Sequence, residues 1–342
     1  MAQYPDWLLD PQWLPHAIVP ASDAIEFVHW TREAHRAATF LSQDYLKPDQ
    51  ARQSLALSEL ARVAMQPSQP LHFVFHSAFC CSTLMARLLD LPGVSMGLKE
   101  PAVLNDVAAL KRQGLPTERL LGLLGPVLTL LSRPLGEGES TIVKPGNGAN
   151  GLIADILDQV PTARALFMYS ALPTFLRSIA KKGLWGRRWA RGLYAQLQPD
   201  SSLDPGFDPA EVLLQSDLQV AAIAWLMHQA QFFDLLKRCT PGRIRSLEGE
   251  TLVAQPAQTL QAVAALFALR LAPAAIANIA GGETLRRDSK THERSFDASQ
   301  RRAEHQQVND AHGEEIAMVL RWAEAVAGHC GVPMTLPAGL LD

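Results

Sequence analysis

The sequence contains few cysteines, and their positions exclude two common uses of this residue. Four cysteines occur in 342 residues, and the adjacent Cys80 and Cys81 lie far along the chain from Cys239 and Cys330. This spacing fits neither a zinc site nor a disulfide framework, so we expect reduced thiols. A redox role for the adjacent pair is disfavoured because the C-x-x-C spacing is absent.

The sequence also lacks a histidine cluster and a long apolar run. His292, His305 and His312 share a C-terminal stretch but form no pair four residues apart beside a carboxylate, so we expect no bound metal. No apolar run approaches the ~20 residues that cross a bilayer. The N-terminal stretch has acids and prolines where a signal peptide needs a basic start, so we expect a cytoplasmic protein without a membrane span.

Charge and composition indicate a globular protein that does not bind nucleic acid. The chain has 31 Lys and Arg residues against 34 Asp and Glu residues, and the formal net charge of −3 gives no chain-wide attraction for a polyanion. Hydrophobic residues make up 48% of the chain, enough to bury a large core. Short apolar runs alternate with helical patterns, which predicts an α/β fold with a central parallel sheet of four or five strands.

Strands and helices are expected in a regular order along the chain. Strands are predicted at 71–75, 141–144, 165–169 and 243–247. Helices are predicted at 82–89, 101–112, 117–132, 150–158, 211–238, 256–269 and 309–328. Residues 184–210 and 281–301 are predicted as long loops. Residues 1–66 are expected to form a helical extension, with a helix from about Pro48, packed on a main domain at 67–342 that includes a helical C-terminus.

The segment F-V-F-H-S-A-F-C-C-S-T-L-M-A-R-L-L-D, residues 73–90, joins an apolar strand to a helix through small residues. Such a turn directs backbone N–H groups at one point, and the Ser82 and Thr83 hydroxyls suit a phosphate or sulfate group. The signature G-x-x-x-x-G-K-[ST] is absent, so a loop for nucleoside triphosphates is disfavoured. An ordinary helix N-cap at Ser82 also fits these residues.

This segment resembles the phosphosulfate-binding loop of the P-loop sulfotransferases, which reads basic residue, Ser, Gly, Thr, Thr, Leu. Phe79, Cys80, Cys81, Ser82 and Thr83 occupy the corresponding places, followed by Leu84. The basic residue is replaced by Phe79 and the glycine by Cys81, whereas both hydroxyls are kept. The resemblance implies a three-layer P-loop fold in which residues 77–83, starting at Ser77, bind 3′-phosphoadenosine 5′-phosphosulfate without a metal.

Two further stretches are similar to the same family in the same order. In Y-S-A-L-P-T-F-L-R-S, Ser178 matches the serine of the family's 3′-phosphate motif, and Ser170 stands where the family has an arginine eight residues earlier. The stretch I-R-S-L-E-G-E-T-L-V-A-Q-P resembles a structural segment of the family. The matches run from about Leu71 to Leu269.

The resemblance implies sulfuryl transfer to a hydroxyl or amine of a small-molecule or glycan acceptor. Glu100 is the candidate general base, or else a carboxylate in the first turn of a helix with Lys99 as its solvated neighbour. Lys144 is the candidate for stabilising developing charge, or else an exposed lysine at a strand end. His76 is a rival base or a donor, or else only locally hydrogen-bonded.

Other loops are expected to supply cations in place of the basic residue and the arginine that the family has at positions 79 and 170. The stretch K-K-G-L-W-G-R-R-W-A-R, residues 181–191, mixes cations with tryptophans and fits a 3′-phosphate, an adenine, an acidic acceptor or a solvated face. Lys290 and Arg294 stand where the family brings a late basic loop over the nucleotide. Two alternatives stay open: a non-catalytic nucleotide- or partner-binding protein of this fold, and a small-molecule kinase.

Overall fold

The centre of the molecule is a parallel sheet of five strands, seen in a computed structural model that describes residues 5–60, 62–63, 69–286 and 298–342. The strand order is β5–β6–β4–β7–β8. The strands are β4 (Leu71–His76), β5 (Ser95–Lys99), β6 (Ser140–Lys144), β7 (Ala165–Tyr169) and β8 (Ile244–Glu248). Every pairing is parallel, which confirms the predicted α/β class and its central sheet.

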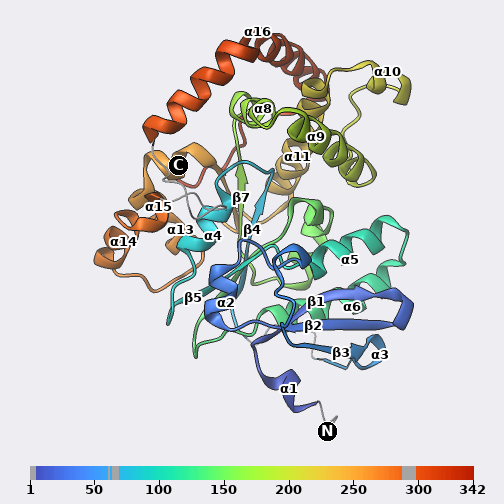
Figure 1. Ribbon diagram of the computed structural model, residues 1–342, viewed down its shortest axis with the longest axis vertical. Coiled ribbons are helices and arrows are strands. Elements are labelled where there is room, and N and C mark those ends of the chain that lie inside the picture. Colours follow the sequence, from blue (N-terminus) through green and yellow to red (C-terminus); the bar gives the residue numbers. More distant parts are fainter. Residues whose placement is uncertain (1–4, 61, 64–68, 287–297) are drawn as a thin grey trace.

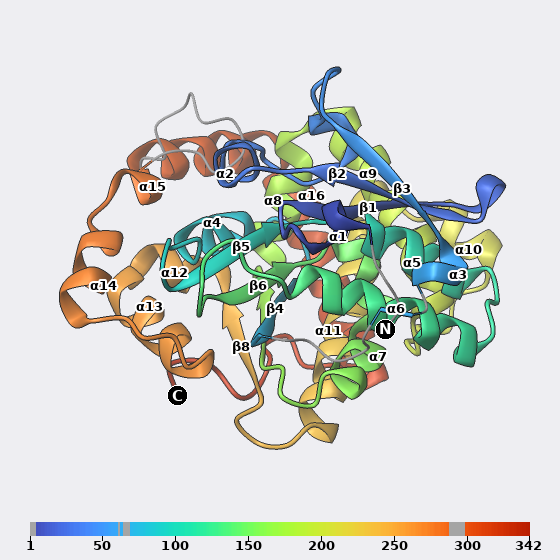
Figure 2. The same cartoon turned by 90° about the horizontal axis from the view of Figure 1, so that it is seen from below.

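Helices cover both faces of this sheet, giving three layers (Figures 1 and 2). Strand residues alternate between two apolar cores, as a pleated strand requires: Phe73 and Phe75 of β4 belong to one core, and Val74 belongs to the other. The core of Val74 contains residues of α4 (Ser82–Leu88), α12 (Gly249–Ala254), α13 (Pro256–Leu266) and α14 (Pro273–Ala280). The core of Phe73 contains residues of α5 (Val103–Arg112), α6 (Thr117–Leu131), α7 (Ile153–Gln159), α8 (Leu172–Lys181), α9 (Gly183–Leu197), α11 (Asp217–Arg238) and α16 (Ala298–Cys330).

Short helices and 3-10 turns connect the larger elements. The remaining helices are α1 (Asp6–Leu9), α2 (Arg32–Ala37), α3 (Leu57–Leu60), α10 (Pro209–Leu214) and α15 (Glu283–Arg286), and the 3-10 turns are η1 (Pro20–Ser22), η2 (Gln43–Tyr45), η3 (Asn147–Leu152) and η4 (Gln198–Asp200). Within the described ranges, no helix is long and apolar enough to cross a membrane.

The N-terminal region is mainly a sheet, which corrects the prediction of a helical extension. Strands β1 (Trp13–Val19), β2 (Ala24–His29) and β3 (Arg52–Ala56) form an antiparallel sheet in that order. The helix expected from about Pro48 is wrong, because this stretch forms β3 and only the short α3. Buried residues of the N-terminal sheet, such as Phe27, join the same core as Phe73 of the main sheet.

Two other expectations differ from the structure. Strand β5 was not expected, because S-M-G-L-K contains a glycine and ends in a lysine, which weakens the pattern of a buried strand. The stretch 184–210 is not a long loop, since most of it lies in the 15-residue helix α9. Ala190 and Leu193 of α9 are buried against the core, and this packing stabilises a helix despite three glycines in its sequence.

The contact between α4 and β5 generates a stability prediction. A Cβ atom on Gly97 would overlap the backbone carbonyl oxygen of Ala86 in α4. Gly97→Ala should therefore lower the free energy of unfolding by about 2 kcal/mol, because backbone must move in a packed core. Gly122→Ala in α6 is the matched control, with nothing within 4 Å of its Cβ, and should raise stability by about 0.5 kcal/mol. Urea denaturation measures both; an equal effect of the two substitutions would contradict the packing argument.

Candidate functional site

The carboxyl ends of the five parallel strands meet at one edge of the sheet and place the candidate residues there. The pairing sets Lys99 opposite Lys144 and His76 opposite Met168. Strand β4 lies between β6 and β7; the chain runs from β4 to β5 on one side and later crosses from β6 past β4 to β7 on the other. Ligands of open α/β sheets bind outside the carboxyl ends at such a switch point. Residues 77–83 follow β4 at this position.

Lys144, Glu100 and His76 form a cluster at this edge. The Lys144 ammonium donates a short hydrogen bond to Glu100 Oε1 and lies 2.9 Å from His76 Nε2, which is 3.7 Å from the same Glu100 oxygen. The Lys144 side chain is fully buried, whereas that of Glu100 is 24% exposed. The alternative of an exposed lysine at a strand end is therefore wrong, and Glu100 is the member of the cluster that solvent reaches.

Both ring nitrogens of His76 have polar partners. Nδ1 accepts from the backbone N–H of Ala78 at 3.1 Å. Nε2 lies 3.1 Å from the Pro145 carbonyl oxygen and 2.9 Å from the Lys144 ammonium. His76 therefore connects the cluster to the loop that follows β4.

Glu100 has an unusual backbone conformation. Its φ is +53°, in the left-handed region that favours glycine, and its N–H donates to the Lys144 carbonyl at 2.6 Å. Helix α5 begins only at Val103, so Glu100 is not in the first turn of a helix and that alternative is wrong. Strained residues of this kind are found where a side chain must be held in a functional position. Here the strain accompanies the contact between the carboxylate and Lys144.

The loop after β4 turns sharply through left-handed residues. Ala78, Phe79 and Cys81 have φ values of +74°, +51° and +59°. Cys81 stands where the sulfotransferase pattern has glycine, and its positive φ shows why glycine suits that position. The Ser77 hydroxyl is fully buried and has no hydrogen-bond partner among the described residues. A buried hydroxyl without a partner requires an explanation such as an absent ligand group.

Neighbouring elements hold this loop in place. The Ser170 hydroxyl donates to the Phe79 carbonyl at 2.6 Å, so Ser170 supports the loop from the end of β7. A Cβ atom on Gly249, at the start of α12, would lie 2.5 Å from the Cys80 carbonyl oxygen, so only glycine permits this close approach. Residues that follow β7 and β8 thus hold the loop that follows β4.

The cysteines and hydroxyls of the loop are mostly buried. Burial raises the pKa of the Cys80 thiol to about 11, so the thiol stays protonated at neutral pH and its nucleophilicity is low. Cys80 donates to the Met168 carbonyl at 3.4 Å, and all four cysteines are free thiols. Ser82 and Thr83 are 5% and 4% exposed at the start of α4.

Ser178 and the stretch 181–191 lie on helices α8 and α9. The Ser178 hydroxyl donates to the Thr174 carbonyl of its own helix at 2.9 Å. Lys182, one turn further on, places its ammonium 5.7 Å from the centre of the Phe79 ring and 5.1 Å from that of Trp185. Trp189 contacts the Phe79 ring edge to face at 5.0 Å. A hollow of about 580 Å³ is lined by Leu184, Trp185, Arg188 and Trp189.

A buried polar chain behind the cluster was missed by the sequence analysis. The Asn150 side-chain amide donates to the His76 carbonyl at 3.0 Å and faces His228 Nδ1 at 3.1 Å. Gln231 donates to the Asn150 carbonyl at 2.7 Å. The G-N-G-A-N-G stretch carried the only signal for this contact, because it follows a strand that ends at the carboxyl edge of the sheet.

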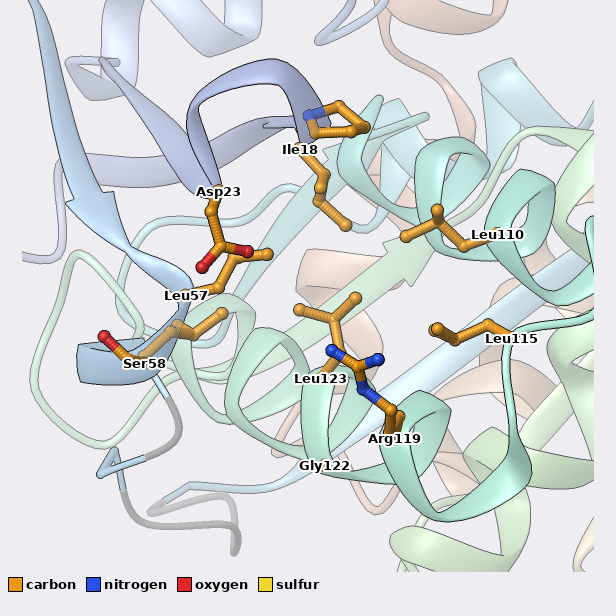
Figure 3. A pocket seen from close by; sticks show the side chains of 11 residues that line it. Ile18, Asp23, Leu57, Ser58, Leu110, Leu115, Arg119, Gly122 and Leu123 are labelled. Carbon is orange, nitrogen blue, oxygen red and sulfur yellow. The ribbon is translucent and has the colours of Figure 1, made fainter.

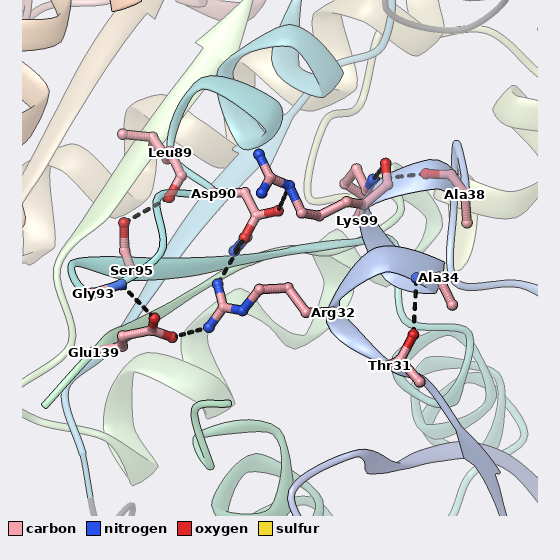
Figure 4. Close-up of polar contacts among 12 residues, drawn as sticks. Thr31, Arg32, Ala34, Ala38, Leu89, Asp90, Gly93, Ser95, Lys99 and Glu139 are labelled. Carbon is pink, nitrogen blue, oxygen red and sulfur yellow. Dashed lines mark hydrogen bonds and ion pairs between the residues drawn. The ribbon is translucent and has the colours of Figure 1, made fainter. Parts of the chain in front are cut away.

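Lys99 is also buried, which corrects its interpretation as a solvated neighbour of Glu100. Its ammonium donates to the carbonyls of Arg36 and Ala38 at 3.0 and 2.6 Å (Figure 4). Burial is the main cause that lowers its pKa to about 7, and the charge of Arg87 adds to the effect. The buried carboxylate of Asp90, also drawn in Figure 4, forms ion pairs with Arg32 at 3.7 Å and Arg36 at 3.2 Å. The segment around α2 is thereby attached to β5.

Two other candidate features lie outside the described residues or away from the cluster. Lys290 and Arg294 lie outside the described residues. A cavity of about 500 Å³ lies between the N-terminal sheet and helices α5 and α6, with Asp23 and Arg119 among its apolar walls (Figure 3). It is at the far end of α5 from Glu100. In the described part of the chain, no group of three His, Cys, Asp or Glu side chains could hold a metal ion.

Comparisons with known proteins give similarity in structure only. No protein-family model matches the chain, and no curated protein matches its sequence. The chain is similar to the sulfotransferase domain from the curacin biosynthetic pathway, with a TM-score of 0.43 and 12% identity over 72% of this chain and 98% of that one. It is similar to the sulfotransferase domain from the Synechococcus PCC 7002 olefin synthase, with a TM-score of 0.40 and 13% identity over 72% and 96%.

The buried Lys99 generates a prediction about pH. Its pKa of about 7 in the folded protein is below the value of 10.5 for a free side chain, so between these values the unfolded chain binds more protons. Stability due to this residue therefore rises with pH across this window. The free energy of unfolding of the protein, minus that of Lys99→Met, should rise from pH 7 to 10 by up to about 1 kcal/mol per pH unit. Urea denaturation at each pH measures this difference. Lys47→Met provides the baseline for an exposed lysine, and a difference that stays flat or falls would contradict the assignment.

Proposed function

We propose that the protein transfers a sulfuryl group from 3′-phosphoadenosine 5′-phosphosulfate to an acceptor hydroxyl or amine. The observation that carries the proposal is the Lys144–Glu100–His76 cluster beside the loop 77–83. A carboxylate, a buried ammonium and an anion-binding turn are the groups that an in-line transfer of a charged group requires. The resemblance of the loop to the sulfotransferase pattern favours a sulfuryl group over a phosphoryl group as the group transferred.

The loop would hold the 5′-phosphosulfate. The unpartnered hydroxyl of Ser77 and the hydroxyls of Ser82 and Thr83 fit an anion with several acceptor oxygens. Cys81 is left-handed and is followed at once by the right-handed helix α4, the combination found in backbone nests that bind anions. Lys144 ends the neighbouring strand and contacts His76, so its ammonium lies at the start of this turn.

The cations that the family pattern has at positions 79 and 170 are replaced from α8 and α9. Lys182 is four residues after Ser178, on the same helical face, and lies over the Phe79 ring. This placement supports a 3′-phosphate site at Ser178 and Lys182. The hollow formed by Trp185, Arg188 and Trp189 would take the purine, since a flat base stacks on tryptophan rings.

In the proposed reaction Glu100 is the general base. It takes the proton of the acceptor group while the acceptor atom bonds to sulfur, and the bridging S–O bond breaks with its electron pair going to the departing phosphate. Lys144 orients the Glu100 carboxylate and stabilises the negative charge that develops on the transferring oxygens. His76 Nδ1 accepts from Ala78, and its Nε2 contacts the Pro145 carbonyl oxygen and the Lys144 ammonium, so both ring nitrogens are engaged and we assign His76 a positioning role rather than that of a base.

Nucleotide binding tests the loop. Calorimetric titration with 3′-phosphoadenosine 5′-phosphate, the product nucleotide, should show saturable binding to the wild-type protein. The double variant Ser82→Ala, Thr83→Ala should bind at least ten-fold more weakly, because hydrogen bonds to a charged group contribute about 1.5–3 kcal/mol each.

Two further variants separate binding from folding. Thr83→Ser keeps the hydroxyl and should keep most of the affinity. The double variant Ser54→Ala, Thr240→Ala removes exposed hydroxyls away from the loop and should bind as the wild type does. Lack of binding by the wild-type protein would reject the proposed donor, and tighter binding of ATP with Mg²⁺ would favour the kinase alternative.

Glu100→Gln tests the chemical step. The substitution keeps the size of the side chain but removes the base, so kcat should fall about 10²- to 10⁴-fold. Binding of the product nucleotide should change little, because Glu100 is not part of the loop. The measurement is transfer of radiolabelled sulfuryl group to a panel of phenols, alcohols, amines and sugars, with Glu118→Gln on the surface of α6 as control. Nucleotide binding without transfer to any acceptor would instead indicate a non-catalytic binding protein.

A further inference from the structure

The segment between α2 and η2, outside the main sheet, reaches the proposed active site. Lys99 attaches this segment through the carbonyls of Arg36 and Ala38. The N–H of Leu41 donates to the Lys99 carbonyl at 2.7 Å, and the Leu41 carbonyl accepts from Ala102 at 3.1 Å. The backbone of the segment is therefore hydrogen-bonded on both sides of Glu100.

This attachment brings an aromatic pair to the cluster. The Phe40 ring centre is 5.5 Å from the Lys144 ammonium. Tyr45 meets the Phe40 ring edge to face, with centroids 5.6 Å apart and planes at 87°. Phe40 and the Glu100 side chain are partly exposed, and Tyr45 is 41% exposed. The two rings thus form an L-shaped wall next to the base that solvent can reach.

We propose that the wall formed by Phe40 and Tyr45 selects an acceptor whose hydroxyl is carried on a flat aromatic ring. This inference rests on the proposed function. The acceptor ring would pack on one side chain and meet the other edge to face, which presents its hydroxyl to Glu100. Aromatic hydroxyls have a pKa near 10, so a carboxylate base removes their proton more readily than that of an aliphatic alcohol.

The transfer step balances with this acceptor. The ring oxygen bonds to sulfur, its proton goes to the Glu100 carboxylate, and the S–O bond to the donor phosphate breaks with the electron pair on the leaving group. No oxidant, reductant or metal takes part. Phe40 touches the acceptor ring rather than the reacting atoms, so it determines specificity.

Binding of 2-naphthol tests the wall without requiring turnover. Fluorescence titration should show that the wild-type protein binds 2-naphthol at least about five-fold more tightly than 2-decalol, its saturated counterpart measured by competition. Phe40→Leu should abolish this preference and leave binding of the product nucleotide unchanged. Phe207→Leu, which removes a partly buried ring stacked on Trp322 elsewhere, should keep the preference.

Two outcomes would overturn the inference: no binding of 2-naphthol by the wild type, or an aromatic preference that survives in Phe40→Leu. Tyr45→Leu is a second variant, exposed enough to fold if Phe40→Leu does not, and should lower the preference in the same way. Titrations are made with and without the product nucleotide. Failure of the nucleotide to bind rejects the proposed function alone, because naphthol binding is read separately.

Discussion

The buried ammonium of Lys144 is the constraint on which the geometry of the carboxyl edge depends. A charge removed from water costs several kcal/mol unless a counter-charge and hydrogen bonds compensate it. Glu100 supplies the counter-charge, and it can do so because its backbone takes a left-handed conformation that turns the chain back toward β6. The side chain that compensates Lys144 is also the one that solvent reaches, so the pair couples stability to the proposed chemistry.

His76 transmits this constraint to the loop that follows β4, residues 77–83. One ring nitrogen faces Lys144, and the other accepts from Ala78 within the loop. The His76 carbonyl is in turn held by Asn150, which contacts the buried His228. A buried network in which the members fix one another's positions holds a site more rigidly than separate contacts do. The loop and the cluster are therefore parts of one structure rather than neighbours that meet by chance.

Much of the fold could be predicted from the sequence, whereas the burial of the charged side chains at the site could not. Four strands of the main sheet were predicted, and the apolar run at 165–169 coincides with β7. In contrast, Lys99 and Lys144 end their strands as surface lysines commonly do, yet both are buried. The segment around α2 covers Lys99, and Glu100 and His76 contact Lys144. A helix was predicted from about Pro48, but the stretch forms β3, because pairing with β2 overrides the local helical preference.

The proposed nucleotide site has its cation outside the loop that follows β4. Phe79 stands where the sulfotransferase pattern has a basic residue, and its ring centre lies 5.7 Å from the ammonium of Lys182, between α8 and α9. Ser170 stands where the pattern has an arginine, and its hydroxyl donates to the Phe79 carbonyl. In the proposed site the cation therefore acts over an aromatic surface rather than from the turn itself. The proposed donor affinity would then depend on the packing of Phe79 against Trp189 as much as on charge.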